Sequence, residues 1–80
     1  MESLRELIAR ILETDEGKIN DKSSPENTEN WDSFNGLMMV SELEKNFNVK
    51  FSIEEVMDVK SVADIKKALR KHGVREKLDD

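Results

Sequence analysis

The residues that could take part in chemistry gather at the pair Asp32-Ser33, in front of a long apolar-periodic stretch. A serine at a helix start lies at the positive end of the helix dipole. An anion attached there is favoured by about 0.3–1 kcal/mol and meets unpaired N–H donors. A nucleophilic serine needs an adjacent base, whereas the single histidine, His72, belongs to the expected last turn of the final helix, where it would act as a cap. Ser33 is thus a candidate attachment site for a charged group or, taken alone, an ordinary helix cap.

The element that must position Ser33 is a helix expected over residues 33–47, with either Asp32 or Ser33 as its N-cap. Its apolar residues follow helical spacing, and Met39, Leu43 and Phe47 fall four apart on the side that should face the core. Adjacent Met38 is then expected at the surface. Gly36 lies inside this helix, at a cost of about 1 kcal/mol relative to alanine.

Three further helices are expected around it. The first spans residues 2–13, with Ser3 as its cap, and a polar connection of residues 14–31 follows, anchored by Ile19 and Trp31. Residues 48–51 read as extended, with Val49 and Phe51 turned toward the core. Capping boxes at 52–55 and 61–64 then open a short third helix, to about residue 57, and a fourth that Gly73 ends.

These elements predict an all-α protein, a small antiparallel bundle of three longer helices plus one short helix. We expect one domain over residues 1–75, with residues 76–80 as a frayed C-terminal tail. No segment suggests a second domain or an internal repeat.

Composition excludes several classes of function. The net charge of −5 argues against nucleic-acid binding, because phosphates would repel the chain. No apolar run or leader pattern suggests membrane insertion, and the absence of cysteine fits a reducing compartment. Asp15, Glu16 and Gly17 match a calcium loop only loosely, so no metal site is predicted. We expect a cytoplasmic monomer.

Several landmarks together resemble the acyl carrier protein family, in its stand-alone form, over almost the whole chain. They are Asp32-Ser33, Leu43-Glu44, Phe47, Val49-Lys50-Phe51, Ile53-Glu54-Glu55 and Lys60-Ser61-Val62-Ala63-Asp64. The dipeptide alone is a weak signal, whereas the ordered set is specific.

The resemblance implies that Ser33 carries a covalent 4′-phosphopantetheine, attached by a phosphopantetheinyl transferase whose metal or basic group Asp32 would contact. The terminal thiol would hold acyl, aminoacyl or polyketide-type intermediates as thioesters, so the protein would be a carrier and not an enzyme. An acyl- or aminoacyl-loading ligase and downstream biosynthetic enzymes would be its partners. They are expected to bind one face, formed by Asp32, Phe34, Leu37, Met38, Ser41, Glu44 and Glu55.

Departures from the family pattern favour a specialised pathway over the housekeeping one. Phe34 stands where the family usually has leucine, and Asn35, Gly36 and Met38 stand where it often has acids. The alternative function is a small helical interaction or regulatory module without a prosthetic group. A DNA-binding helix-turn-helix variant is weaker still, because the net charge disfavours it.

Overall fold

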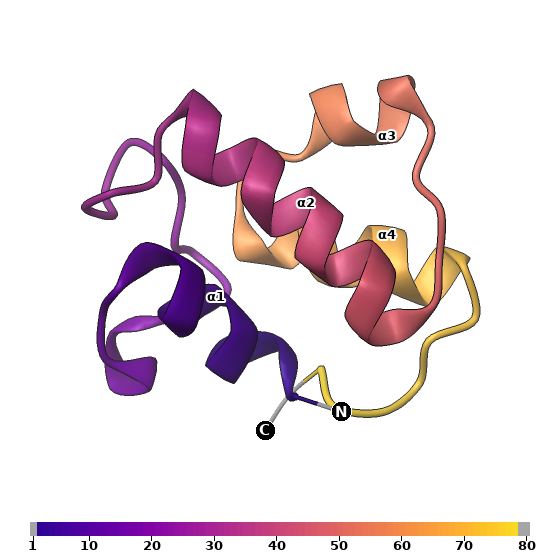
Figure 1. Ribbon diagram of the computed structural model, residues 1–80, viewed down its shortest axis with the longest axis horizontal. Helices are drawn as coiled ribbons and strands as arrows, with labels where there is room; N and C mark the ends of the chain where they lie inside the picture. Colours follow the sequence, from indigo (N-terminus) through magenta and orange to yellow (C-terminus); the bar gives the residue numbers. More distant parts are fainter. Residues whose placement is uncertain (1, 79–80) are drawn as a thin grey trace.

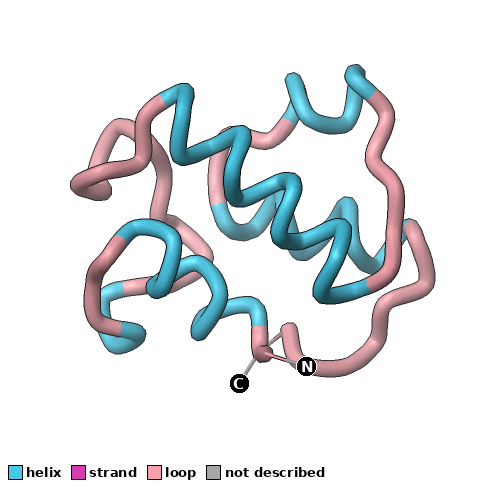
Figure 2. Tube along the Cα trace, in the orientation of Figure 1, coloured by secondary structure: helices cyan, strands magenta, loops and turns pink. Residues whose placement is uncertain are grey.

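The computed structural model describes residues 2–78, and within them the protein is all-α (Figure 1). Its helices are α1 (Leu4–Leu12), the 3₁₀ turn η1 (Glu16–Lys18), α2 (Ser33–Phe47), α3 (Ile53–Asp58) and α4 (Val62–Lys71). Figure 2 shows the long loop between η1 and α2, and it shows no strand within residues 2–78. The prediction of three longer helices and a short one is confirmed.

Serine caps explain where α1 and α3 begin. In α1, the Ser3 hydroxyl accepts from the Glu6 N–H at 3.2 Å, and the Glu6 carboxylate accepts from the Ser3 N–H at 3.0 Å. Ser52 and Glu55 repeat this reciprocal pair at the start of α3, at 3.1 and 2.9 Å. Both capping boxes satisfy two N–H groups that a helix start would otherwise leave unpaired.

The start of α4 differs from the box expected there. The Ser61 hydroxyl accepts from the Asp64 N–H at 3.4 Å, but the Asp64 carboxylate accepts from the Lys60 N–H, at 2.9 Å, instead of from Ser61. Aspartate is one methylene shorter than the glutamate of a standard box, which accounts for the changed partner. Carbonyls of the long loop pair with two more N–H groups of α4: Val62 N–H with Ser23 O at 2.9 Å, and Ala63 N–H with Asp21 O at 3.1 Å.

One hydrophobic core joins α1, α2 and α4. From α2 it takes Met39, Leu43 and Phe47, as the four-residue spacing predicts, while Met38 remains 40% exposed. Ile19 and Trp31 anchor the long connection in this core, and Val49 and Phe51 pack against it while partly buried. The remaining core residues are Leu4, Leu7, Ile8, Ala9, Ile11, Leu12, Val62, Ile65, Leu69 and Leu78.

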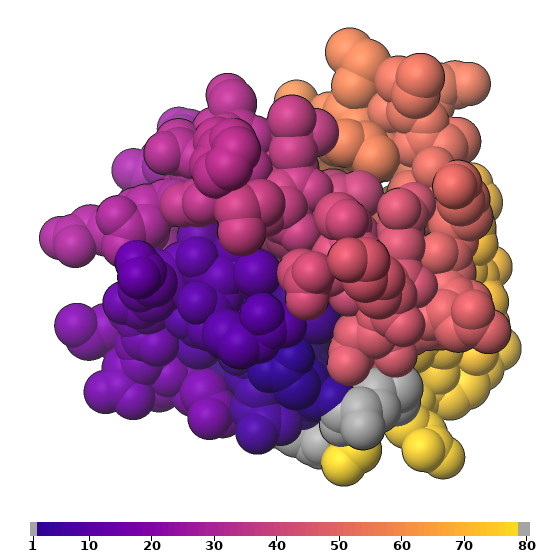
Figure 3. Space-filling model, in the orientation of Figure 1, coloured from indigo at the N-terminus to yellow at the C-terminus, as the bar shows by residue number. Residues whose placement is uncertain are grey.

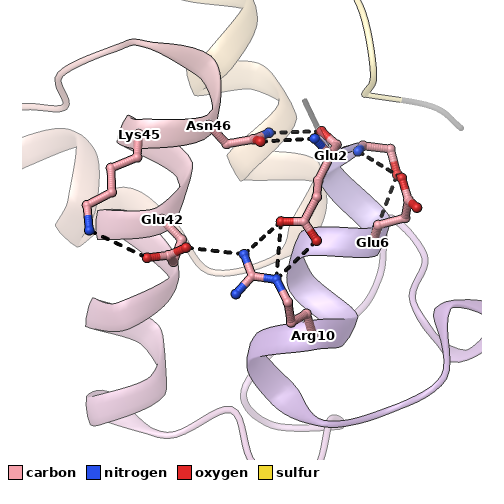
Figure 4. Close-up of polar contacts among 7 residues, drawn as sticks. Glu2, Glu6, Arg10, Glu42, Lys45 and Asn46 are labelled. Carbon is pink, nitrogen blue, oxygen red and sulfur yellow. Dashed lines mark hydrogen bonds and ion pairs between the residues drawn. The ribbon is translucent and has the colours of Figure 1, made fainter.

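Polar contacts tie α1 and the residue just before its cap, Glu2, to the last turns of α2 (Figure 4). The Asn46 amide accepts from the Glu2 N–H at 3.0 Å and donates to the Glu2 carbonyl at 2.8 Å. Beside it, Arg10 pairs with Glu2 at 2.7 Å and with Glu42 at 3.2 Å, and Lys45 lies 3.8 Å from Glu42. The hydrogen bond from Arg10 lowers the pKa of the Glu2 carboxyl.

The C-terminal residues contact the start of α1. Leu78 is buried in the core, and the Leu4 N–H donates to the Lys77 carbonyl at 2.7 Å. The domain boundary at residue 75 stays a prediction, and of the tail expected over 76–80, residues 79 and 80 lie outside the described residues.

Candidate functional site

Asp32, and not Ser33, is the N-cap of α2. Its carboxylate accepts from the Asn35 N–H at 2.8 Å, and its own backbone is extended. Ser33 is the first residue inside the helix and is exposed to solvent. The hydroxyl of Ser33 therefore stands at the helix start with no capping task, which resolves the choice that the sequence leaves open.

Two asparagines hold the chain just before Ser33. Asn30 adopts a left-handed backbone, with φ 68°, and its side-chain amide donates to the Leu12 carbonyl at 2.8 Å. The Asn35 amide in turn donates to the Asn30 carbonyl at 2.7 Å. Asparagine tolerates the left-handed conformation better than most residues. These bonds connect the entrance of α2 to the end of α1, and the sequence reading did not anticipate them.

Gly36 lies beside Trp31, the buried residue of the same entrance. A Cβ placed on Gly36 would meet the Trp31 Nε1 at 3.6 Å, an ordinary van der Waals contact. Trp31 therefore does not demand a glycine at this position, and the helix carries the cost of glycine without a steric reason.

A cavity of about 600 Å³ opens beside Ser33, between α2, α3 and α4. Its side chains are mainly apolar, with Asp32, Ser33 and Glu55 as the charged or polar groups. The rest of the lining comprises Pro25, Trp31, Gly36, Leu37, Met39, Val40, Leu43, Phe51, Val56, Val59, Ile65 and Ala68. Figure 3 shows the first half of α2 and the separate body of α3 on the same face of the molecule. The sequence reading predicts no such cavity, because its walls come from residues far apart in the chain.

Long-range polar contacts fix the segment that carries α3. The Glu44 carboxylate of α2 accepts from the Phe51 N–H at 2.9 Å. His72 Nε2 lies 2.9 Å from Glu55 Oε2, and its ring makes an edge-to-face contact with Phe51, with centroids 5.4 Å apart. His72 is the C-cap of α4, as predicted, but its side chain also joins α4 to α3. The pKa of Glu55 is lowered, chiefly by the hydrogen bond from the Ser52 N–H. Burial raises this pKa in part, and the hydrogen bond with His72 lowers it further.

The residues expected to form a partner-binding face divide into two groups. Asp32, Phe34, Leu37, Met38 and Ser41 are exposed along the first turns of α2. Glu44 and Glu55 are half-buried and engaged in the contacts just described.

Two exposed apolar residues of α3, Ile53 and Met57, were not among the predicted site residues. They fall four apart on one side of a helix that has no buried residue. The available signal was the shortness of α3, since a helix of six residues next to a loop offers few positions to the core.

Comparison with protein families gives a match over most of the chain. A family model described as "phosphopantetheine attachment site" matches residues 2–69. No curated protein matches the chain. Within residues 2–78, no helix combines the length and apolarity needed to cross a membrane.

Proposed function

The chain belongs to the phosphopantetheine attachment site family, whose members hold a covalent 4′-phosphopantetheine on a serine, and we propose that Ser33 is that serine here. Domains of this family are carriers and not catalysts. The prosthetic group supplies a terminal thiol that holds cargo as a thioester, and the protein supplies position and recognition. In this chain we propose acyl, aminoacyl or polyketide-type cargo in a specialised pathway.

The surroundings of Ser33 fit a phosphodiester. Its side chain is exposed, and among residues 2–78 no protein acceptor pairs with the N–H groups of Ser33 and Phe34 at the start of α2. Free N–H groups at a helix N-terminus suit an anionic phosphate. The adjacent cavity offers an apolar surface next to the attachment point. These observations concern this chain's own residues and support attachment at Ser33.

The other described serines are less suitable. Ser3, Ser52 and Ser61 use their hydroxyls as helix caps, and Ser23 is buried, where it accepts from the Asn20 N–H at 3.0 Å. Ser24 lies in the long loop and Ser41 lies in the middle of α2. The observation that carries the proposal is that Asp32 caps α2, which leaves the exposed hydroxyl of Ser33 at the helix start.

Asp32 has a second proposed role. Its carboxylate places a negative charge beside the phosphodiester, which on its own is unfavourable. We propose that it contacts the metal or a basic group of the phosphopantetheinyl transferase. The same face, with the exposed Phe34, Leu37, Met38 and Ser41 and the half-buried Glu44 and Glu55, is proposed to meet the loading ligase and the downstream enzymes of a cytoplasmic, monomeric carrier.

Intact-mass analysis tests the proposal. After incubation with coenzyme A and a broad-specificity phosphopantetheinyl transferase, the wild-type protein should gain one phosphopantetheinyl group. The Ser33→Ala variant should remain folded by circular dichroism and gain none. A folded Ser33→Ala protein that still gains the group would contradict Ser33 as the site. A wild type that gains nothing would favour the interaction module without a prosthetic group.

A further inference from the structure

Ser33 stands in a short segment whose two ends are joined by hydrogen bonds. The Asn35 side-chain amide donates to the Asn30 carbonyl at 2.7 Å, and the Asn35 N–H donates to the Asp32 carboxylate at 2.8 Å. The Asp32 N–H also donates to the Asn30 carbonyl, at 3.1 Å. The proposed attachment site therefore lies inside a loop that Asn30 and Asn35 close.

Asn30 connects this loop to α1. Its side-chain amide donates at 2.8 Å to the carbonyl of Leu12, the fully buried last residue of α1. The last carbonyls of a helix have no N–H partner within their own helix, and this amide satisfies one of them. We call the two bonds, from Asn35 to Asn30 and from Asn30 to Leu12, the asparagine bridge. It joins the start of α2 to the end of α1.

The residues next to Ser33 offer little other restraint. Asp32, Ser33 and Phe34 are exposed, and Gly36 lowers the helix propensity of the first turn. Trp31 is the buried residue of this segment, with 7% of its surface exposed. The asparagine bridge therefore supplies a restraint on the serine that its exposed neighbours lack.

On the basis of the proposed function, we propose that Asn30 and Asn35 are positioning residues for the modification of Ser33. In that reaction the Ser33 Oγ forms a bond to the phosphorus of coenzyme A that carries pantetheine. The bond from this phosphorus to the bridging oxygen breaks, adenosine 3′,5′-bisphosphate leaves, and the hydroxyl proton passes to a base of the transferase. A nucleophile misplaced by about 1 Å can cost on the order of a hundredfold in rate. The asparagine bridge holds the hydroxyl where this attack can occur.

Two variants break the asparagine bridge at different points. Asn35→Ala removes the amide that donates to the Asn30 carbonyl. Asn30→Gly keeps that carbonyl and tolerates the left-handed backbone, with φ 68°, and removes only the bond to Leu12. The matched control is Asn46→Ala, because this asparagine also bonds backbone groups between the α1 and α2 ends, but at Glu2, far along α2 from Ser33.

The first measurement needs no transferase. Trp31 is the single tryptophan of the chain and lies next to Asn30, so its fluorescence reports on this entrance. In Asn35→Ala and Asn30→Gly the emission should move to longer wavelength, and acrylamide should quench it about twofold more strongly than in wild type, because the entrance opens more often. Asn46→Ala should keep the wild-type signal.

The second measurement is the modification of Ser33 by a broad-specificity phosphopantetheinyl transferase with coenzyme A, on variants shown to be folded by circular dichroism. In Asn35→Ala and Asn30→Gly, kcat should fall by about fivefold or more, because the hydroxyl spends less time in reach of the phosphorus. KM should stay within about twofold, because neither variant alters a charged or apolar side chain that the enzyme could bind. Asn46→Ala should lose stability and keep the wild-type kcat.

Several results would overturn the inference. A wild-type kcat or a wild-type Trp31 signal in both bridge variants contradicts it. A fall in kcat for Asn35→Ala alone means that the transferase contacts Asn35 directly, and an equal fall for Asn46→Ala means that overall stability sets the rate. A wild type that is never modified contradicts the proposed function itself, and the Trp31 signal then still decides whether the asparagine bridge holds the entrance of α2.

Discussion

His72 at the end of α4 lies with its Nε2 2.9 Å from the Oε2 of Glu55 on α3, and Glu55 is one of the residues that line the cavity next to Ser33. Because α3 has no buried residue, its position depends on such polar contacts and on the Glu44–Phe51 bond more than on core packing. Elements with few buried contacts are the ones that open most readily. The side of the cavity that α3 forms is therefore its least firmly held side.

The first prediction concerns pH. The folded pKa of Glu55 is lowered from 4.5, chiefly by the Ser52 N–H and further by His72, against an opposing effect of burial. The ionised carboxylate therefore stabilises the fold above about pH 4.5, and this contribution is lost as pH falls through the lower folded pKa. We expect Glu55→Gln to be less stable than wild type at pH 7, with the difference shrinking in acid. Urea unfolding from pH 7 to pH 3 measures this, and a difference that does not change with pH would contradict it.

A second prediction separates the two residues at the start of α2. Asp32→Ala removes the cap and should cost about 0.5–2 kcal/mol of unfolding free energy. Ser33→Ala removes an exposed hydroxyl that caps nothing, and should change stability by no more than about 0.5 kcal/mol. Chemical denaturation of the two variants side by side is the measurement. Equal losses, or a larger loss for Ser33→Ala, would show that the cap is wrongly assigned.

A third prediction concerns Gly36. An added Cβ meets only an ordinary contact with Trp31, so Gly36→Ala should stabilise the protein by about 0.5–1 kcal/mol through helix propensity. In the wild type, amides 35–37 should exchange faster with solvent than amides 43–47, because the glycine and the long loop lie next to them. Hydrogen exchange measures both the stability gain of Gly36→Ala and the difference in protection between the two segments. This difference should be smaller in the alanine variant than in the wild type. Equal protection of the two segments in the wild type would refute the mobility of this entrance.

The fourth prediction compares two contacts between α1 and α2. Asn46→Ala leaves the part-buried N–H and carbonyl of Glu2 unpaired, which should cost about 1–3 kcal/mol. Arg10→Gln removes exposed ion pairs and should cost about 0.2–1 kcal/mol, less at high salt. Urea unfolding at low and high salt distinguishes them. A larger or salt-independent loss for Arg10→Gln would show that the ion pairs are worth more than their exposure suggests.

The sequence predicts the parts of this fold that depend on local spacing. Ser3, Ser52 and Ser61 mark helix starts because a cap and its N–H partner are three residues apart, and the choice of Met39 over Met38 for the core follows from helical period. Ser33 is singled out by its place at the expected helix start together with the family resemblance, and its role as the attachment site stays a prediction.

Contacts between distant residues were beyond that reading. The Glu44–Phe51, His72–Glu55 and Asn46–Glu2 hydrogen bonds each join a side chain to a group in another element. The cavity depends on all of α2, α3 and α4 together, so no spacing within one segment indicates it. The capping box expected over residues 61–64 was wrong in detail, because the shorter side chain of Asp64 selects the Lys60 N–H.

The hydrogen bond between Leu4 and Lys77 places both ends of the described chain at one pole of the molecule. α2 starts at the other pole, as Figure 1 shows, and Ser33 is the first residue of this helix. A tether joined at either end of the described chain would leave from the same pole and would not cross the surface around Ser33, the proposed attachment site. The point where such a tether leaves the domain and the proposed attachment site of the prosthetic group would then lie at opposite poles of the molecule.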